Sequence, residues 1–323
     1  MKSIIFFNNK GGVGKTTTVY HVAWMLSELG IKTIAIDLDP QSNLTSMFLT
    51  PERLEEVYER DLSLTILDSI NPVVSGEPYK PVHIENISDN LGLILGNLSL
   101  SVFEDKLSDA WLKSLGGDAY AFKLTSIFNT IINDAVSRFG AEIVLIDVGP
   151  NLGAINRAVT ISSDFIIMPV ASDLFSLQGI KNLGQTLQKW KIDWQDRVQR
   201  KPKDVAFEIP SKNSTPIGYI VMQYSAKESS PVKSYLKWAN RIPAIFSEYV
   251  LGNKLDVKSV DNDNNCIALL KHYRSLAPMS MESNKPIFLL KPADGAIGAH
   301  LYAVQKSYEE FKSLTINILN KCK

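Results

Sequence analysis

The most informative stretch of this chain runs Asn8-Asn9-Lys10-Gly11-Gly12-Val13-Gly14-Lys15-Thr16-Thr17. It follows the apolar run at residues 3–7 and opens a segment with helical periodicity, so we predict a strand, a glycine loop and a helix N-terminus in that order. Backbone N–H groups of such a loop surround phosphate oxygens, and the helix dipole adds positive potential. Lys15 is placed to reach β- and γ-phosphates, and the Thr16 hydroxyl is placed to ligate Mg²⁺. The stretch therefore predicts a nucleotide phosphate site.

The loop differs from the common pattern G-x-x-x-x-G-K-[ST] in two ways. Asn9 stands where the first glycine would fall, and a second lysine, Lys10, precedes the glycine pair. Because Lys15 already serves the phosphates, we interpret Lys10 as a cation for another phosphate group, in a facing subunit. The sequence here resembles the ParA/MinD family of deviant-Walker ATPases, whose signature is K-G-G-x-G-K-[ST]. The resemblance implies an ATP-bound homodimer in which Lys10 reaches the partner's nucleotide. The loop residues expected to bind ATP are Lys10, Gly11, Gly12, Val13, Gly14, Lys15, Thr16 and Thr17.

Composition limits the class of protein. The 323 residues are 45% hydrophobic, which is enough for one large α/β domain. The formal net charge is zero, so nucleic-acid binding would require a local basic patch. Cys266 and Cys322 lie far apart and outside any C-x-x-C pair, which fits a reducing cytosol and indicates no metal site. No apolar run approaches the ~20 residues that span a bilayer. We therefore expect a cytoplasmic protein without stable membrane insertion.

Short apolar runs alternate with helix-period stretches along most of the chain, as in parallel strands buried on both faces. We predict strands at residues 3–7, 33–38, 91–95, 142–147, 164–170, 217–222 and 287–290. Apolar stripes predict helices around residues 19–29, 128–139 and 301–318, and Gly30 is placed to end the first of these. The pattern predicts a doubly wound α/β fold with a mostly parallel sheet and helices on both faces. We expect one domain over residues 1–323, with polar additions at 190–215 and 252–265.

Aspartates stand at the ends of two predicted strands. Asp37 and Asp39 are two positions apart, so they point the same way if the strand continues. Carboxylates at this end of a parallel strand face the crevice where ligands bind. Asp147 follows four apolar residues and is interpreted as a Walker B aspartate that holds Mg²⁺ through water. Residues 37–43 also keep the family's D-x-D-P-Q-x-N run. By resemblance, Asp39 positions the attacking water and Asp37 supports the metal site.

The predicted site thus has three parts. The expected catalytic residues are Lys10, Lys15 and Asp39. The expected Mg²⁺ residues are Thr16, Asp37 and Asp147. A late segment, residues 275–287, is similar to the part of the family that closes around adenine. That similarity places Met222, Gln223 and Pro278 near the base.

Residues 147–153 read D-V-G-P-N-L-G and resemble the family's D-x-P-P-S-x-G switch, which senses the γ-phosphate. Gly149 replaces the first proline and Asn151 replaces the serine. Because proline restricts the open and unfolded states, we expect Gly149 to loosen this switch.

The resemblance implies slow ATP hydrolysis coupled to DNA partition or cargo positioning, with nonspecific DNA and a ParB-like or other stimulating protein as partners and an association with the nucleoid. Six basic residues, against Asp193 and Asp196, form a local cluster around Trp190 and Trp194. A positive patch binds the phosphate backbone without reading sequence. A solvated helix with two core-facing tryptophans would show the same pattern, and both interpretations stay open. The basic residues are Lys189, Lys191, Arg197, Arg200, Lys201 and Lys203.

Two other functions are compatible with the sequence. A membrane-cycling ATPase of the MinD kind would need a basic amphipathic C-terminal helix, of which Leu314, Ile318 and Leu319 give a faint version that Ile316 interrupts. A nucleotide-dependent binding module with little hydrolysis is motivated by Gly149 and its neighbour Asn151. An iron–sulfur reductase of the nitrogenase type is excluded, because the two cysteines are not placed to bind a cluster at a dimer interface.

Overall fold

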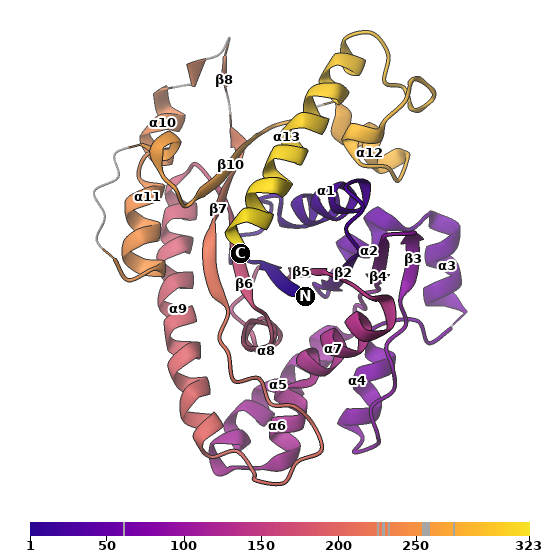
Figure 1. Cartoon of the computed structure of the whole chain (residues 1–323), viewed down its shortest axis with the longest axis vertical. Coiled ribbons are helices and arrows are strands. Elements are labelled where there is room, and N and C mark those ends of the chain that lie inside the picture. The colour runs from indigo at the N-terminus through magenta and orange to yellow at the C-terminus, as the bar shows by residue number, and fades with distance from the viewer. Residues whose placement is uncertain (61, 225, 228–229, 232, 254–258, 274) are drawn as a thin grey trace.

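The fold is taken from a computed structural model that describes residues 1–60, 62–224, 226–227, 230–231, 233–253, 259–273 and 275–323. Its centre is an eight-stranded sheet with the order β10-β7-β6-β1-β5-β2-β4-β3 (Figure 1). All neighbouring strands pair in parallel except β3 and β4, which pair antiparallel. The strands of this sheet are β1 (Lys2–Phe6), β2 (Thr33–Leu38), β3 (Glu85–Ser88), β4 (Leu91–Ile94), β5 (Ile143–Val148), β6 (Phe165–Ala171), β7 (Thr215–Tyr224) and β10 (Cys266–Lys271). A separate small ladder pairs β8 (Ala226–Lys227) with β9 (Ser230–Pro231).

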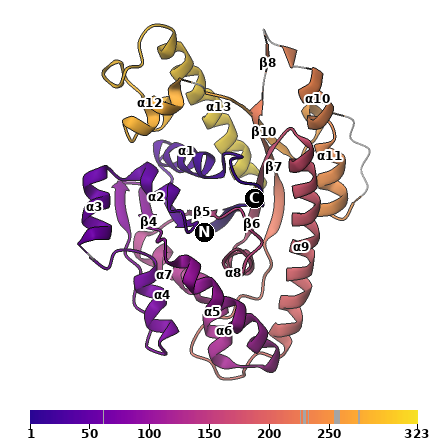
Figure 2. The same cartoon turned by 180° about the vertical axis from the view of Figure 1, so that it is seen from behind.

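Helices cover both faces of the sheet, as predicted (Figures 1 and 2). Ile4 and Phe6 of β1 belong to one core, and Ile5 and Phe7 belong to the other. The first core is closed by α1 (Lys15–Glu28), α2 (Asn43–Phe48), α3 (Pro51–Glu59), α12 (Leu276–Glu282) and α13 (Ala299–Lys321). The second is closed by α4 (Leu67–Val74), α5 (Leu100–Lys113), α6 (Ala119–Thr125), α7 (Ile127–Phe139), α8 (Ala154–Ser162), α9 (Leu174–Gln199), α10 (Lys233–Ala239) and α11 (Ile242–Ile245). Strand side chains alternate between the two faces, so each strand supplies both cores.

The prediction of a strand at residues 287–290 is wrong. Ile287–Leu289 form a 3₁₀ turn, η4, and their side chains pack into the α1 and α13 side of the core. Such a short apolar run does not distinguish a strand from another buried segment. The last strand is β10, which follows directly on the polar stretch 252–265 and was not predicted. The polar edge strand β3 was also not predicted, because its burial is only partial and its pattern lacks an apolar face.

The polar addition at 190–215 consists of the end of a helix and the segment that follows it. Up to Gln199 it is the end of the 26-residue helix α9, in which Trp190 and Trp194 are both buried. Beyond that helix the chain returns beneath it, and Trp194 Nε1 donates a hydrogen bond to the Pro210 carbonyl oxygen at 2.8 Å. The two tryptophans are therefore core residues. In the other addition, residues 254–258 lie outside the described part of the chain.

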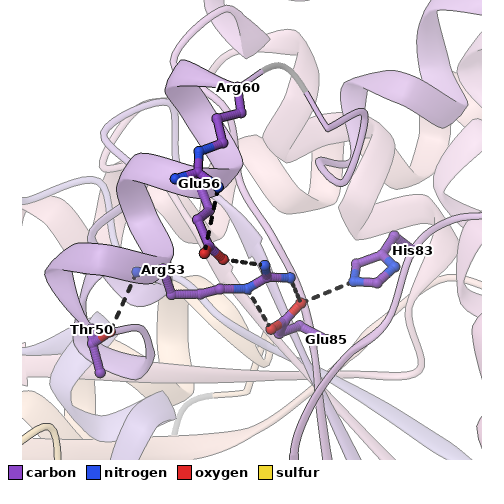
Figure 3. A network of polar contacts seen from close by, with 6 residues as sticks. All are labelled: Thr50, Arg53, Glu56, Arg60, His83 and Glu85. Atoms are coloured by element: carbon purple, nitrogen blue, oxygen red, sulfur yellow. Dashed lines mark hydrogen bonds and ion pairs between the residues drawn. The ribbon is translucent and has the colours of Figure 1, made fainter.

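An ion-pair network joins α3 to the edge strand β3 (Figure 3). Arg53 donates from Nε and Nη2 to the two carboxylate oxygens of Glu85, each at 2.9 Å, and from Nη1 to Glu56. His83 contacts the same Glu85 carboxylate at 3.0 Å. The paired Arg–carboxylate geometry fixes α3 against the outermost strand. The network thereby helps to cover an edge that would otherwise expose unpaired backbone groups.

The C-terminal helix α13 is docked on the sheet through its apolar stripe. Leu314 and Ile318 are buried, and α13 packs on α1 and η4. Ile316 is 41% exposed and points away from that stripe. Across the described ranges, none of the helices combines the length and the apolar character that crossing a bilayer requires.

Candidate nucleotide-binding site

A cavity of about 520 Å³ lies at the carboxyl ends of the central strands. The glycine loop and the start of α1 form one wall, and residues from α2 and α12 form the other. Ligands bind at this edge of open parallel sheets. The lining residues are Gly11, Gly12, Val13, Gly14, Lys15, Thr16, Thr17, His21, Asp39, Gln41, Asn43, Ser46, Met47, Pro150, Tyr273, Ala277, Ser280, Met281 and Ile287.

The glycine loop owes its shape to two left-handed residues and one buried anchor. Gly12 and Gly14 have φ values of 70° and 78°, which a residue with a side chain rarely adopts. Val13 between them is buried, which holds the turn down on the sheet. Gly14 is also the N-cap of α1 and offers no side-chain cap, so the first N–H groups of the helix stay directed at the cavity. The geometry is that of an anion-binding helix N-terminus.

Asn8 fastens this loop and was not singled out by the sequence. Its Nδ2 donates to the Pro169 carbonyl oxygen at 2.6 Å, and its Oδ1 accepts from the Lys10 N–H at 3.0 Å. The side chain is buried, so both bonds are shielded from water. Asn8 thus connects the glycine loop to β6.

The two lysines of the loop have different environments. Lys15 is buried, and that burial lowers the pKa of its ammonium group, although the charges of Asp147 and Asp39 act in the opposite direction. Lys10 is about one-third exposed and forms an ion pair with Asp173 of its own chain, with Nζ 2.6 Å from Oδ2. Burial acts to raise the pKa of Asp173, but Lys10 and Ser176 together hold it below its usual range. Lys15 lines the cavity, whereas Lys10 does not and is held instead by Asp173, the N-cap of α9.

Asp37 and Asp147 face each other in register on β2 and β5, and both are fully buried. Burial is the main cause that raises the pKa of Asp37 to about 7. Its Oδ2 accepts from the Thr45 N–H and hydroxyl at 2.8 and 2.7 Å, and its Oδ1 accepts from the Asp39 N–H at 3.3 Å. Burial and the nearby Asp37 charge also raise the pKa of Asp147. Neither oxygen of Asp147 has a hydrogen-bond partner among the described groups.

The different hydrogen bonding of Asp37 and Asp147 determines which of them fits a hard cation, because such a cation prefers free oxygen ligands. Asp147 has two buried oxygens without a hydrogen-bond partner among the described groups, and Thr16, which lines the cavity at the first turn of α1, is near enough to act on Asp147 and lower its pKa. Both therefore fit a Mg²⁺ site. Asp37 has committed its oxygens to Thr45 and Asp39, so its environment is that of a residue that holds the 37–45 turn. Within the described ranges, no cluster of three or more His, Cys, Asp or Glu could hold a metal by itself.

Asp39 is the carboxylate that lines the cavity. It is 7% exposed, and its Oδ1 accepts from the Gln41 N–H at 3.0 Å. The switch segment lies against it, because a Cβ added at Gly149 would stand 3.5 Å from Asp39 Oδ1. Pro150 of the same segment lines the cavity beside the glycine loop. Asp39 and residues 149–151 are thus adjacent in space although about 110 positions apart in sequence.

The base end of the cavity differs in detail from the expectation. Met222 is buried beneath the glycine loop, where its Sδ accepts from the Thr18 hydroxyl at 3.6 Å, and it does not line the cavity. Gln223 continues β7, and its side chain lies outside the described part. Pro278 is exposed on α12, while its neighbours Ala277 and Met281 line the cavity. The position of the base therefore stays a prediction, with α12 contributing Ala277, Ser280 and Met281 to the cavity wall.

His21 has a defined place on the cavity wall. Its Nδ1 lies 2.7 Å from the Thr17 carbonyl oxygen, and its Nε2 lies 3.2 Å from the Ile287 N–H. The ring is buried and stacks on Phe311. Burial lowers the pKa of His21 to about 4. His21 therefore joins the helix after the glycine loop to the segment that closes the base end.

The basic cluster predicted around α9 is smaller at the surface than in the sequence. Arg197 is buried, and its guanidinium donates to the Trp111 and Asp193 carbonyl oxygens, so it is removed from the exposed set. Arg200 is exposed and forms an ion pair with Asp196 at 3.1 Å. The lysines of the cluster, all of them exposed, are Lys189, Lys191, Lys201 and Lys203.

Comparisons with known proteins agree with this geometry. A family model described as AAA domain matches residues 1–199. The chain is 31% identical over 237 residues to the uncharacterized protein MJECL24 of Methanocaldococcus jannaschii, covering 72% of this chain and 77% of that protein. It is 29% identical over 188 residues to protein IncC of Escherichia coli, covering 58% of this chain and 46% of IncC. The matched part therefore spans less than half of IncC.

Solved structures share the fold along nearly the whole chain. Protein DIP2308 from Corynebacterium diphtheriae has a TM-score of 0.76 at 22% identity, covering 99% of this chain and 98% of that one. The structure of pNOB8 ParA bound to nonspecific DNA has a TM-score of 0.58 at 16% identity, with coverages of 99% and 98%. At these identities the likeness concerns the fold.

Proposed function

The chain belongs to the AAA domain family and is related to the ParA-type partition ATPases, and from this premise we propose that it is a Mg²⁺-dependent ATPase that dimerises with ATP. The observation that carries the proposal is one cavity lined by the glycine loop, Lys15 and Asp39, with the charges of Asp39 and of the buried Asp147 acting on Lys15. We further propose that residues 1–323 form one such domain, since strands from Lys2 to Lys271 share one sheet.

Each charged residue has a separate task in this proposal. Phosphoryl transfer requires charge neutralisation and in-line positioning more than covalent help. The buried ammonium of Lys15 neutralises the β- and γ-phosphates, and one oxygen of Asp39 orients the attacking water while Gln41 holds the other. When bound, Mg²⁺ supplies further charge neutralisation, and Thr16 and Asp147 are the residues that would hold it. Asp37 supports Asp39 by binding the turn that carries it.

The exposed surface around Lys10 supports a homodimer in which Lys10 acts on the partner's nucleotide. Lys10 and Asp173 are both partly exposed. The next two residues, Leu174 and Phe175, expose 53% and 76% of their surface. Large apolar side chains exposed beside a functional cation are typical of an interaction surface. Release of Lys10 from Asp173 would make it available to a second copy.

We propose that the dimer binds nonspecific DNA and that this binding serves DNA partition or cargo positioning. A ParB-like or other stimulating protein is the proposed partner. The relative solved with nonspecific DNA is named ParA, and this chain offers four exposed lysines along and after α9. Lysines that neutralise phosphates give sequence-independent, salt-sensitive binding. Association with the nucleoid would follow from such binding.

The alternative functions receive less support. The apolar residues that a membrane-binding C-terminal helix would need are used for packing, since Leu314 and Ile318 are buried. A module with little hydrolysis remains compatible with Gly149 in the switch, and turnover measurements separate it from the ATPase.

The proposal is tested by binding of a fluorescent ATP analogue and then of nonspecific duplex DNA, with ATP, with ADP and without nucleotide, across a salt series. The Lys15→Ala variant should lose nucleotide binding, whereas Lys306→Ala, at an exposed position on α13, should retain it. Tight ATP binding by Lys15→Ala would refute the phosphate-loop assignment. ATP-selective, salt-sensitive DNA binding supports the partition function. Absence of DNA binding in every state would redirect the search to anionic liposomes and protein cargo.

A further inference from the structure

The side chain of Asn156, on the first turn of α8, binds both ends of residues 149–151 in the switch segment. Its Nδ2 donates to the Gly149 carbonyl oxygen and to the Asn151 carbonyl oxygen, each at 2.7 Å, and lies 3.2 Å from Asn151 Oδ1. A primary amide has two N–H donors, so the two short bonds use both of them. Asn156 is only 2% exposed, so water does not compete for these bonds. One buried amide therefore fixes residues 149–151 from below.

The segment that Asn156 holds is packed between the water-positioning carboxylate and the glycine loop. A Cβ at Gly149 would lie 3.5 Å from Asp39 Oδ1, and a Cβ at Gly11 would lie 3.9 Å from Pro150 Cγ. A shift of residues 149–151 therefore changes the surroundings of Asp39 and of the phosphates together. Displacements of about 1 Å in a positioned site can cost about 100-fold in rate.

The segment needs an external restraint because of its own sequence. Gly149 has no side chain to limit its backbone, and glycine loses more conformational freedom on ordering than any other residue. Asn156 can supply the restraint because its own helix is anchored: the Ala154 N–H at the start of α8 donates to Glu104 Oε1 of α5 at 2.7 Å. An amide on an anchored helix is a rigid support for a mobile loop.

We propose that Asn156 is a positioning residue for ATP hydrolysis, which holds residues 149–151 against Asp39 and so fixes the place of the attacking water. The inference rests on the proposed ATPase function. It also changes the expectation for Gly149, because the looseness that glycine introduces is offset in the folded chain by two hydrogen bonds from α8.

The test compares steady-state ATP turnover and ATP-analogue affinity in Asn156→Ala with those in two other variants. Asn156→Ala should lower kcat about 10- to 100-fold while the nucleotide Kd changes less than about twofold. Thr160→Val is the matched control: it removes a 2.7 Å hydrogen bond one turn further along α8 and leaves the amide in place, so its kcat should equal that of the wild type. Adding Gly149→Ala to Asn156→Ala should restore part of kcat, because the added Cβ fits and limits the backbone.

Several results would overturn the inference. These are an unchanged kcat in Asn156→Ala, a parallel loss of nucleotide affinity and kcat, or an equal loss in Thr160→Val. If Asn156→Ala does not fold, Asn156→Ser takes its place with the same expectation. Failure of the underlying ATPase proposal is distinguishable, since it would appear as absent turnover in the wild type. In that case amide hydrogen exchange tests the contact directly. If residues 149–153 exchange no faster in Asn156→Ala than in the wild type, Asn156 does not hold the segment.

Discussion

We expect His21 to make the folded protein sensitive to mild acid, by an amount that follows from its burial and contacts. A neutral ring with its hydrogen on Nδ1 donates to the Thr17 carbonyl oxygen and accepts the Ile287 N–H at Nε2. A second proton on Nε2 removes the bond to Ile287 and places a charge against Phe311, on which the ring stacks with centroids 4.7 Å apart. Burial is the main reason that the pKa of His21 falls to about 4.

The sign and magnitude come from comparing the folded and unfolded chains. In the unfolded chain the imidazole has a pKa of 6.5, so between pH 6.5 and pH 4 the unfolded state binds a proton that the folded state does not. The free energy of unfolding therefore falls as the pH falls through this window and is unaffected by His21 above it. Between pH 8 and pH 5 the loss from His21 is about 2 kcal/mol. That is a large share of the ~5–15 kcal/mol typical of a folded protein.

The assay is urea unfolding without nucleotide at pH 8 and pH 5, for the wild type and for His21→Asn. Asparagine can still donate to the Thr17 carbonyl oxygen but does not titrate. The variant should be less stable at pH 8, by about 1–3 kcal/mol for the unpaired Ile287 N–H. On acidification it should lose about 2 kcal/mol less than the wild type. His300→Asn, at a partly exposed position near Ser275, should follow the wild type. Equal pH dependence in the wild type and His21→Asn would refute the reasoning.

Three other predictions concern the site. Asp39→Ala should bind ATP and accumulate as a dimer in sedimentation experiments while turnover falls about 100-fold or more; undiminished turnover would remove its role in positioning water. Reversing Lys201 and Lys203 to glutamate should weaken DNA binding and flatten its salt dependence in fluorescence anisotropy, and unchanged affinity would leave them as ordinary surface residues. Asp173→Asn removes the ion pair of Lys10 and should strengthen ATP-dependent dimerisation up to about fivefold; an unchanged dimer Kd would mean that this partly exposed ion pair does not oppose assembly.

The architecture could be predicted where local patterns determine it. Parallel strands such as β2 and β5 are buried along their whole length and are apolar except at Thr33, Asp37 and Asp147, and Gly30 follows the end of α1 in a left-handed conformation, as the sequence indicated. The errors occur where local pattern is ambiguous. The run at 287–290 is apolar because it packs against α1 and α13, and nothing within four residues reveals that partner. Strand β10 follows a polar stretch that favours a loop, and it is identified by its pairing with β7.

The site residues, too, could be predicted only where a local sequence pattern determines them. The glycine loop is a continuous motif whose function depends on its own backbone, so its residues could be named from the sequence. His21 contacts Ile287 across 266 positions, and Tyr273 lines the same cavity, so no spacing rule connects them to the loop. Asn156 contacts residues only five and seven positions before it, but the sequence pattern does not show that its amide binds both of their carbonyl oxygens. Arg197 shows the opposite error: in the sequence it is one cation among six, and in the structure its contact with Trp111 withdraws it from the surface.

The two strand-end aspartates show most clearly what the fold adds. In the sequence Asp37 and Asp147 look alike, since each closes an apolar strand, and the sheet then sets them side by side in register. Burial raises the pKa of both carboxylates, and the charge of Asp37 raises that of Asp147 further, so the pair is costly to keep charged without nearby cations. Thr45 satisfies Asp37 with two hydrogen bonds, which leaves Asp147 as the carboxylate with unused oxygens toward Lys15 and the cavity. The proposed division of one aspartate to the turn and the other to a metal site therefore depends on Thr45, eight residues beyond Asp37, which the apolar pattern does not mark.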